Sequence, residues 1–335
     1  MLHGKQLLTI LVVCGSLSAI IVVYFTDTFT NNNYANVLPR NVSQCNRVGF
    51  AIPTTGNGLG NHLFYYAAVM HVAWLTGRRP CVWTQPRVRV PKRLDEVFDL
   101  DIKHINVDTF GCPFHTFKHD GVYNYDRRVE SLVDVSANES LWIRGSFCSW
   151  KYTHPIASEL RQQLVFRHEL TEFVADFLAT NVPPGWTILE YVRVGVHVRR
   201  GDFLGAWARS KGFTVANERY LQRAMNYFVE RFQRVQFIVA SNDIKWCQKH
   251  VTLSMFNNTN VNITFSVKHN TGQDLALLAS CDHTVMTTGT YSWWSAWLAN
   301  GTTVYYANFP QRGSWLNTQI RSHEFFRLDW IAIYD

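Results

Sequence analysis

Two adjacent arginines are the residues of this 335-residue chain whose types and spacing point most clearly to chemistry. Arg199 and Arg200 follow directly after the apolar run 192–198 (VRVGVHV), which is typical of a buried strand. Guanidinium groups present planar sets of N–H donors that match phosphate oxygens. A pair of them at the end of a strand can stabilise the charge on a departing nucleoside diphosphate without a metal ion.

Two other interpretations of this segment stay open at this point. The arginines can instead form structural ion pairs with Asp202 and neighbouring carboxylates. The tripeptide Arg200-Gly201-Asp202 also matches integrin-type adhesion sites, but three residues are a weak signal. A position at the end of a strand favours a cleft over an exposed loop tip.

A glycine-rich turn at 54–61 (TTGNGLGN) lies between a strand pattern at 48–52 and an apolar helix pattern at 62–76. Glycines permit close backbone approach, and the N-terminus of the following helix offers free N–H groups to a polar ligand. The spacing differs from the dinucleotide fingerprint, and no acidic residue follows about 20 residues later. A plain tight turn between strand and helix is the alternative.

Two further polar turns follow strand patterns at 236–240 and 283–286. Hydroxyl and N–H groups at such turns can bind a base, ribose or phosphate, although helix capping is the simpler interpretation of each turn alone. Polar turns at one edge of one sheet favour a nucleotide site. The residues concerned are Ser241, Asn242 and Asp243 in the first turn and Thr288, Thr290 and Ser292 in the second.

The triplet Asp99-Leu100-Asp101 has the D-x-D spacing with which many glycosyltransferases hold a divalent cation. Its apolar neighbours look like packing residues, and a short acidic triplet does not define a metal site, so we interpret it as structural. The cysteines have no zinc-binding spacing. We therefore expect no metal and no other cofactor. The expected packing residues are Leu94, Val97, Phe98, Leu100 and Ile102.

Alternating strand and helix patterns predict an α/β protein whose second half is a mostly parallel, doubly wound sheet. The first half begins with a β-turn-α-β unit that ends in a strand pattern at 80–83, and a long amphipathic helix is predicted at 157–179. The segment 181–186 (NVPPGW) ends that helix, and we take it as the domain boundary. In the second half, strand patterns at 192–198, 236–240, 263–267, 283–286 and 302–306 alternate with helix patterns at 217–232, 243–250, 273–280 and 293–299.

Near the N-terminus, residues 7–25 contain no Asp, Glu, Lys or Arg, and as a helix they just span a bilayer core. This pattern predicts an uncleaved membrane anchor, with a cleaved signal peptide as the alternative. Lys5 favours a cytoplasmic N-terminus, which places the rest of the chain in the lumen.

Sequons and cysteines agree with a secretory compartment. Cys14 lies in the predicted anchor, and the other six cysteines allow up to three disulfides. The candidate glycosylation sites are Asn41, Asn138, Asn257, Asn262 and Asn300, and the six cysteines are Cys45, Cys81, Cys112, Cys148, Cys247 and Cys281.

The formal net charge of +7 comes from Lys and Arg residues that are scattered along the chain. A solvated basic surface explains this better than nucleic-acid binding, and the excess positive charge would help to attract an anionic nucleotide-sugar.

Several segments together resemble glycosyltransferase family 11, the galactoside α-1,2-fucosyltransferases. The resemblance covers about residues 48–310, and HVRRGD together with MTTGTYSWWSAWLA is its most specific part. It implies a GT-B-type fold of two Rossmann-like domains, type II Golgi membrane topology, and metal-independent, inverting transfer of fucose from GDP-β-L-fucose to a glycan acceptor, most readily the 2-hydroxyl of a β-galactoside. The segments are GNGLGNHLFYYAAVMHVAWLTGRRP, GSFCSW, VGVHVRRGDF, ASNDIKWC and DLALLASCDHTVMTTGTYSWWSAWLANG.

The resemblance also implies a domain plan. We expect a cytoplasmic tail at 1–6, a transmembrane signal-anchor at 7–25, a stem at 26–46, an acceptor-side α/β domain at 47–185 and a GDP-fucose-binding α/β domain at 186–335.

Site roles follow residue by residue from the same resemblance. The arginines would stabilise the departing GDP, and the nearest carboxylate would act as the acid–base group or only orient the arginines. The implied catalytic residues are Arg199, Arg200, Asp202 and Asn61, and the implied substrate-binding residues are His197, Ser241, Asn242, Asp243, Thr288, Thr290, Ser292, Gly58 and Gly60.

This chain departs from the vertebrate pattern in the glycine turn, where Gly58 and His62 stand at positions that favour Arg and Gln. A fucosyltransferase of different linkage is therefore one alternative. A membrane-tethered glycan-binding protein without catalysis is another, because the chain has 12 tryptophans that could stack on sugars. We expect most of those tryptophans to be buried.

Overall fold

The computed structural model describes residues 44–51, 58–84 and 94–335. The predicted tail, the predicted anchor, most of the stem and the Asn41 sequon lie outside these residues. Within them, no helix has the length and apolar character that a membrane span requires. The described residues form one compact unit.

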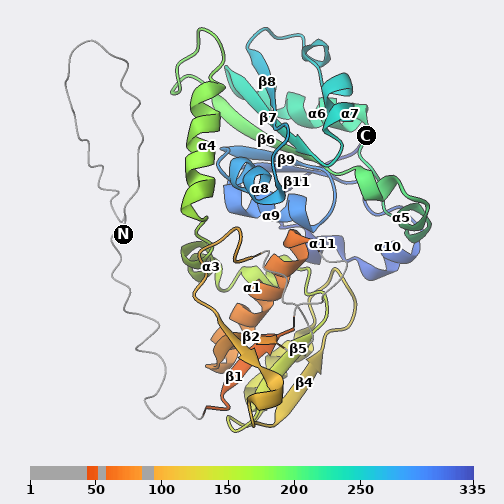
Figure 1. Cartoon of the computed structure of the whole chain (residues 1–335). Helices are drawn as coiled ribbons and strands as arrows, with labels where there is room; N and C mark the ends of the chain where they lie inside the picture. The colour runs from red at the N-terminus through yellow and green to blue at the C-terminus, as the bar shows by residue number, and fades with distance from the viewer. Residues whose placement is uncertain (1–43, 52–57, 85–93) are drawn as a thin grey trace, which may run out of the picture. The chain divides into compact units, whose positions relative to one another are not determined.

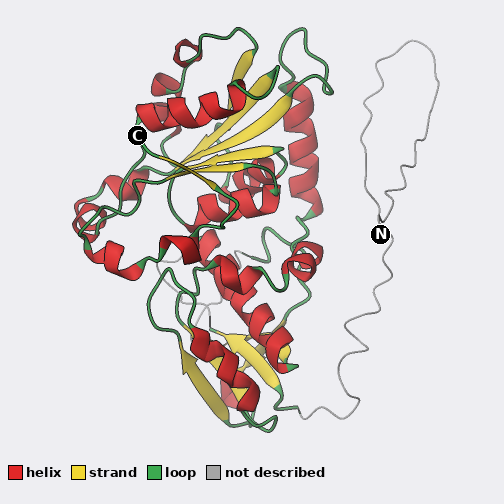
Figure 2. Ribbon diagram, turned by 180° about the vertical axis from the view of Figure 1, so that it is seen from behind, coloured by secondary structure: helices red, strands yellow, loops and turns green. Residues whose placement is uncertain are grey.

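The second half of the described chain forms a parallel sheet in the order β11-β10-β9-β6-β7-β8, with helices on both faces (Figures 1 and 2). This confirms the predicted doubly wound sheet. Its strands are β6 (Val192–Val198), β7 (Val235–Ser241), β8 (Val261–Phe265), β9 (His283–Met286), β10 (Thr303–Tyr306) and β11 (Ile331–Ile333). The helices between them are α6 (Glu218–Val229), α7 (Ile244–His250), α8 (Thr271–Ala279) and α9 (Thr290–Ala299).

Local sequence explains why these helices begin where they do. The Asn217 side chain accepts a hydrogen bond from the Tyr220 N–H and caps α6. Asn270 and Gln273 form a capping box at the start of α8. The apolar stripe of α6, which includes Leu221 and Phe228, is buried against the sheet.

The first half forms a second parallel sheet in the order β3-β2-β1-β5-β4. The sequence predicted β1 and β2 and the helix between them but not the other three strands, because those are short and two of them lie largely exposed at the sheet edges. The elements are β1 (Arg47–Phe50), α1 (Leu59–Thr76), β2 (Arg79–Thr84), β3 (Lys103–Asn106), β4 (Phe114–Lys118) and β5 (Ser140–Arg144).

Helix α1 is apolar all round because both of its faces are buried. Tyr65 and Val69 belong to the core of the first sheet. Phe64 and Ala67 belong to the larger core that includes the second sheet. Before its last turn, where Trp74 is exposed, the helix contacts two cores and has no solvated face, which explains its lack of amphipathic pattern.

The prediction of one continuous helix at 157–179 is wrong, because the segment forms two helices, α3 (Ala157–Gln163) and α4 (His168–Thr180). Between them, Phe166 forms an antiparallel bridge with Phe98. The Val165 carbonyl accepts a hydrogen bond from the Asp99 N–H at 2.9 Å. Pairing with a distant segment thus replaces helical hydrogen bonds here, and sequence periodicity carries no signal of it.

The segment that pairs with this break contains the D-x-D triplet. Leu94, Val97 and Phe98 are buried, which confirms that they are packing residues. Among the described residues, no three His, Cys, Asp or Glu side chains gather closely enough to hold a metal ion.

Helix α4 ends at Thr180, before the predicted breaker at 181–186. Its side chains Phe173 and Phe177 pack against a cluster that contains Leu277 of α8. The boundary between residues 185 and 186 stays a prediction. The remaining short helices are α2 (Trp150–Thr153), α5 (Ala206–Lys211), α10 (Trp315–Gln319) and α11 (Ser322–Phe325), with 3₁₀ turns η1 (Val107–Thr109), η2 (Arg127–Asp134), η3 (Gly201–Leu204) and η4 (Leu253–Met255).

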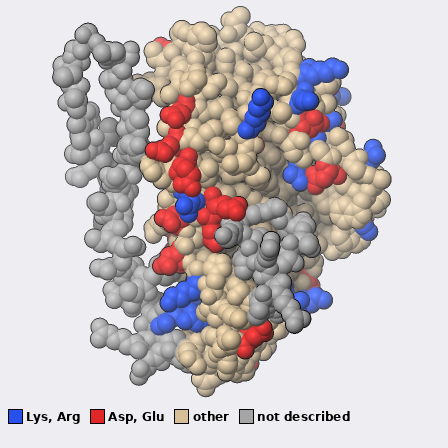
Figure 3. Space-filling model, in the orientation of Figure 1, with Lys and Arg blue, Asp and Glu red and all other residues tan. Residues whose placement is uncertain are grey.

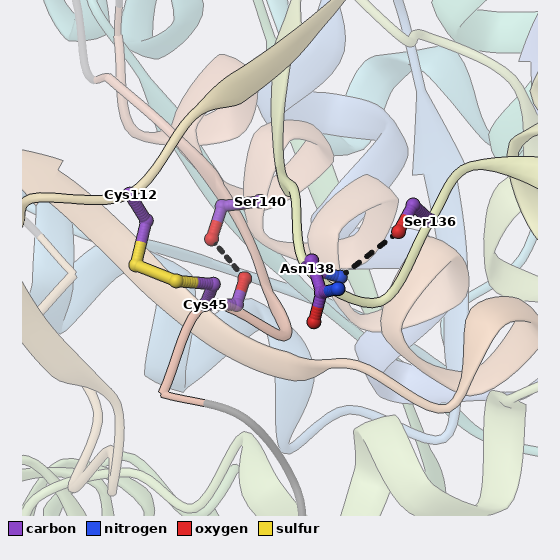
Figure 4. The surroundings of a disulfide bond; sticks show 5 residues. All are labelled: Cys45, Cys112, Ser136, Asn138 and Ser140. Atoms are coloured by element: carbon purple, nitrogen blue, oxygen red, sulfur yellow. Dashed lines mark hydrogen bonds between the residues drawn. A yellow bond between two sulfur atoms is a disulfide. The ribbon is translucent and has the colours of Figure 1, made fainter.

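A disulfide joins Cys45 to Cys112 beside the first sheet (Figure 4). The Ser140 hydroxyl donates a hydrogen bond to the Cys45 carbonyl. The described residues hold this one disulfide, within the expected limit of three. Each remaining described cysteine is unpaired and buried in a different part of the fold, where it serves as a small apolar side chain: Cys81, Cys148, Cys247 and Cys281.

Four of the predicted glycosylation sites are described. Asn138, which lies near the disulfide in Figure 4, Asn257 and Asn300 are exposed, whereas Asn262 is half-buried on β8. Their occupancy stays a prediction.

On the face shown in Figure 3, Asp and Glu side chains gather mostly along the left edge, whereas Lys and Arg form smaller separate groups at the lower left, in the upper centre and on the right. This arrangement agrees with the scattered distribution of basic residues along the sequence.

His71 is a titratable group buried within α1. Its ring meets the rings of Tyr125 and Tyr152 edge to face, with centroids 6.3 and 5.6 Å apart. Burial lowers the pKa of His71 to about 4, so the imidazole is neutral at pH 7.

We expect this histidine to make the fold sensitive to acid. As pH falls, the unfolded chain binds the proton near pH 6.5 and the folded chain only near pH 4. The contribution of neutral His71 to the free energy of unfolding is therefore complete above pH 6.5 and is lost as pH falls toward 4. The loss reaches about 3 kcal/mol. His71→Phe should therefore reduce the slope of unfolding free energy against pH in this window, measured by urea unfolding. His115→Phe, at an exposed position on β4, is the control for removal of a surface imidazole.

Candidate active site

Side chains from the neighbouring turns accept hydrogen bonds from the backbone N–H groups just after the carboxyl end of β6. The Arg199 N–H donates to Thr287 Oγ1, and the Arg200 N–H donates to Asn242 Oδ1, each at 2.9 Å. Thr287 follows β9 and Asn242 follows β7. The prediction that these polar turns meet at one sheet edge is confirmed.

The strand order of the sheet reverses between β6 and β9, at the same carboxyl ends. The chain passes from β6 to β7 and β8 on one side and returns to β9, β10 and β11 on the other. Crossover helices leave from opposite faces at such a point and open a crevice between them, which is where ligands bind in doubly wound sheets.

Arg199 lies at this point, with a third of its side chain exposed (33%). Its Nη2 donates to Asp202 Oδ2 at 2.8 Å, and its guanidinium carbon lies 5.3 Å from the centre of the Phe203 ring. The Asn242 amide also donates to Asp202 Oδ1, at 3.4 Å. Asp202 is therefore held between two donors and orients the Arg199 side chain.

Arg200 is less exposed, at 14% of its side chain. Its Nε donates to Asp243 Oδ2 at 3.3 Å. The guanidinium carbon stands 3.7 Å from the centre of the Trp246 ring, so the cation is stacked on the indole. Asp243 also caps α7 through the Trp246 N–H, and its own N–H donates to Ser241 Oγ.

Both arginines thus form the carboxylate pairs that the alternative interpretation expected. Among the described residues, however, each guanidinium donates through a single nitrogen, Nη2 in Arg199 and Nε in Arg200. A guanidinium carries five N–H donors, so most of them are available to another acceptor. The ion pairs fix the orientation of the two cations without using up their capacity to bind an anion. The packing of Arg200 on Trp246 also disfavours the adhesion interpretation, which needs an exposed arginine.

His197 lies behind the arginines in the interior. The Ser292 hydroxyl donates to the Thr288 carbonyl at 3.0 Å, so the hydrogen bond of 2.5 Å between Ser292 Oγ and His197 Nδ1 has the imidazole as donor. Burial and the Arg199 charge lower the pKa of His197 to about 3, which keeps the ring neutral. Direct contact of His197 and Ser292 with a ligand stays a prediction.

The N-terminus of α9 lies at the same edge, after Gly289, whose φ of 90° favours glycine. Thr288 Oγ1 is buried here without a hydrogen-bond partner among the described residues. An unpaired buried hydroxyl costs free energy unless a ligand or water completes it. The free N–H groups of the first turn of α9 add partial positive charge.

Helix α1 reaches this edge from the first half of the chain. A Cβ atom on Gly60 would lie 2.5 Å from the Thr290 carbonyl carbon and from the Tyr291 nitrogen, which is closer than real Cβ contacts. The Thr290 hydroxyl donates to Asn61 Oδ1 at 2.8 Å. The close approach that Gly60 permits is therefore between the N-termini of α1 and α9.

Gly58 differs from Gly60. It precedes α1 in an extended conformation with a φ of −76°, and a Cβ there would meet no atom of the described residues within 4 Å. Backbone freedom is thus not required at Gly58, and its predicted ligand contact stays a prediction. The turn residues Gly56 and Asn57 lie outside the described part of the chain.

Two guanidinium groups and the positive ends of α1 and α9 consequently converge on one edge of the second sheet. Such an arrangement suits a ligand with more than one negative charge, and the planar donors match phosphate oxygens.

The sequence of this chain also matches a known protein family. The model of the family described as glycosyl transferase family 11 matches residues 38–334. The chain belongs to glycosyl transferase family 11. This confirms the resemblance inferred from the HVRRGD and MTTGTYSWWSAWLA segments.

Curated relatives of this family 11 member carry a consistent name. A mouse protein, galactoside alpha-(1,2)-fucosyltransferase 1, is 32% identical over 286 residues, which cover 84% of this chain and 71% of the relative. A pig protein, galactoside alpha-(1,2)-fucosyltransferase 2, is 28% identical over 279 residues, covering 82% and 77%. Among solved structures, POFUT1 in complex with GDP has a TM-score of 0.49 at 12% identity, covering 78% of this chain and 99% of that chain.

Sequence reasoning missed a second polar cluster at the same sheet edge of this glycosyltransferase. After β8, the Ser266 hydroxyl lies 2.7 Å from His269 Nδ1 and 2.5 Å from Asp274 Oδ1. Burial raises the pKa of Asp274. The signal available was a single carboxylate in the otherwise apolar helix pattern that begins at the Asn270 cap.

We expect Gly60→Ala to damage the site, because the added methyl must push α1 away from α9. Transfer activity should fall at least tenfold, and the midpoint of thermal unfolding should drop. Gly58→Ala is the matched control for stability, two residues away, and should retain the wild-type midpoint of thermal unfolding. Equal midpoints for the two variants would contradict the close contact of the two helices.

Proposed function

We propose that this chain transfers L-fucose from GDP-β-L-fucose to the 2-hydroxyl of a β-galactoside, with inversion at the fucose C1. The observation that carries the proposal is the pair Arg199 and Arg200 at the strand-order reversal, beside the N-terminus of α9. The names of the curated relatives support fucose as the transferred sugar and a galactoside as the acceptor.

In the proposed reaction, the acceptor oxygen attacks C1 from the side opposite GDP, and the bond between C1 and the β-phosphate oxygen breaks. The electron pair of that bond passes to the phosphate oxygen. Arg199 and Arg200 stabilise the new negative charge through N–H donors that their carboxylate partners leave unused. The free N–H groups of α9 act on the same charge, and the buried Thr288 hydroxyl gains a partner. No metal ion is part of this proposal.

Two further residues have proposed roles near the acceptor. Asn61, held by Thr290, faces the reacting centre from the first half of the chain. The acceptor hydroxyl loses its proton as it attacks, and this proton passes to Asp202, the nearest carboxylate to the arginines, or to solvent water if Asp202 only orients Arg199 through its hydrogen bonds.

A fucosyltransferase of different linkage is the second candidate, favoured by the departures at Gly58 and His62 in the glycine turn. Linkage analysis of the product separates the two enzymes. A non-catalytic glycan-binding protein would release no GDP from GDP-fucose with any acceptor.

The proposal includes location and fold type. We infer a GT-B-type arrangement of two Rossmann-like domains, with a signal-anchor at 7–25 that holds the chain in the Golgi membrane as a type II protein. The apolar length of that segment, the sequons and the Cys45–Cys112 disulfide support a lumenal catalytic region.

The main test is Arg200→Lys. Lysine keeps the charge but loses the planar donors and the stacking on Trp246, so transfer from GDP-fucose should slow by about a hundredfold, or about 2.7 kcal/mol. The measurement is the initial rate of GDP release with a β-galactoside acceptor, with and without a chelator, which should not change the rate.

Arg231→Lys is the matched control. Arg231 also stacks on an aromatic ring, 3.6 Å from the centre of Tyr227, but it lies beyond the end of α6. This variant should transfer at the wild-type rate. Wild-type activity in Arg200→Lys would rule out the proposed role of the guanidinium pair.

A further inference from the structure

Two tryptophans stand out on the surface near the proposed active site. Trp207 on α5 is 68% exposed and Trp315 on α10 is 48% exposed. Elsewhere in the described chain, tryptophan is buried or half-buried except at Trp74. Large exposed indoles lose the benefit of burial, so a pair of them on neighbouring elements points to a ligand.

Helices α5 and α10 lie side by side in both views of the fold (Figures 1 and 2). The Gln311 N–H donates to the Gly212 carbonyl at 2.9 Å, which ties the end of α5 to the segment before α10. The Lys211 ammonium lies 5.3 Å from the centre of the Trp315 ring. The two indoles therefore belong to one continuous surface.

Aromatic contacts connect this surface to the arginines. The Arg199 guanidinium lies over Phe203, and the Phe203 and Phe213 rings are 4.6 Å apart. Phe213 in turn stacks against Trp207, with ring centroids 6.0 Å apart and planes inclined by 29°. A ligand on Trp207 would thus be separated from the proposed diphosphate site by Phe213 and Phe203.

The surroundings of the two indoles are polar. Exposed polar residues lie on both segments beside the rings, and Leu204 is an exposed large apolar neighbour. A pyranose matches this pattern, because its C–H face is apolar while its hydroxyl groups point outward from the edge of the ring. An apolar protein partner or a lipid core would need a more continuous apolar patch. The exposed polar residues are Arg209, Ser210, Gln311, Arg312 and Asn317.

We propose that Trp207 and Trp315 form an acceptor subsite that binds sugar residues beyond the galactose that receives fucose. This inference rests on the proposed function, because it is the acceptor chain that must extend outward from the reacting hydroxyl. The indole faces stack on the sugar rings, and Lys211 and the flanking polar groups bind their hydroxyls.

The test compares a short and a long acceptor with the full-length chain in detergent. The short acceptor is methyl β-galactoside, and the long one is a tetrasaccharide with a terminal β-galactose. Trp207→Ala and Trp315→Ala should each raise KM for the tetrasaccharide about tenfold. Both should leave kcat, KM for methyl β-galactoside and KM for GDP-fucose unchanged.

Two control variants accompany these measurements. Trp207→Phe keeps an aromatic face and should recover most of the affinity for the tetrasaccharide. Trp74→Ala removes an exposed indole near the other end of α1 and should change no kinetic constant. Unfolding temperatures establish that each variant is folded.

Several outcomes would overturn the subsite. Unchanged KM for the tetrasaccharide in both alanine variants would do so, as would an equal rise for both acceptors. Altered sedimentation or vesicle binding in the alanine variants, without any change in KM, would assign the surface to a second copy or to a membrane instead.

A binding measurement separates this inference from the proposed function. If the wild-type chain transfers no fucose, saturation-transfer NMR with the tetrasaccharide and GDP still reports the subsite. A signal that both alanine substitutions abolish would support glycan binding while the proposed reaction fails. A signal that survives both substitutions, or none from the wild-type chain, would reject the subsite.

Discussion

The contact between the N-termini of α1 and α9 is the constraint on which the site depends. Gly60 has no side chain, so the two helix starts meet at backbone distance, and the Thr290 hydroxyl binds Asn61 across the contact. Each helix follows a strand next to the reversal point of its own sheet. The contact therefore brings the carboxyl ends of strands from two parallel sheets together and directs two helix dipoles to the same place.

That convergence has an electrostatic cost, since two guanidinium groups add full charges to the partial charges of the helix ends. Asp202 and Asp243 compensate the arginines in the absence of a ligand, and Trp246 stacks against one of them. His197, deep in the same edge, is kept neutral by burial and by Arg199. A buried neutral imidazole adds no further cation to the strand end, so Arg199 and Arg200 carry the positive charge there.

The sequence left open whether Arg199 and Arg200 form ion pairs or bind an anion, and the positions of Asp202 and Asp243 allow both. Ion pairing and anion binding are not exclusive for arginine, because one pair occupies only part of its five donors. Asp202 follows β6 and Asp243 follows β7, and each of them holds one of the two guanidinium groups. The two ion pairs thus fix the positions of the guanidinium groups.

Several expectations failed where a long-range contact overrides the local pattern. The helix predicted at 157–179 breaks because Phe166 pairs with Phe98, which lies almost seventy residues earlier in the chain. The strands β3 and β4 went unrecognised since edge strands are short and half exposed, so their apolar alternation is weak. Pairing of cysteines depends on which of them the fold brings together, and in the described residues this holds for Cys45 and Cys112.

By itself, the sequence determined the alternating strands and helices of the second half, the polar turns at their ends, and the arginine pair that follows β6. These features are local, since they depend on hydrophobic period, caps and turn residues within a few positions. Only the tertiary structure decided that Gly60 serves a helix contact, that His197 is buried, and that Trp207 and Trp315 share a surface. Those facts depend on which distant segments touch, and side-chain type and spacing along the chain do not encode that information locally.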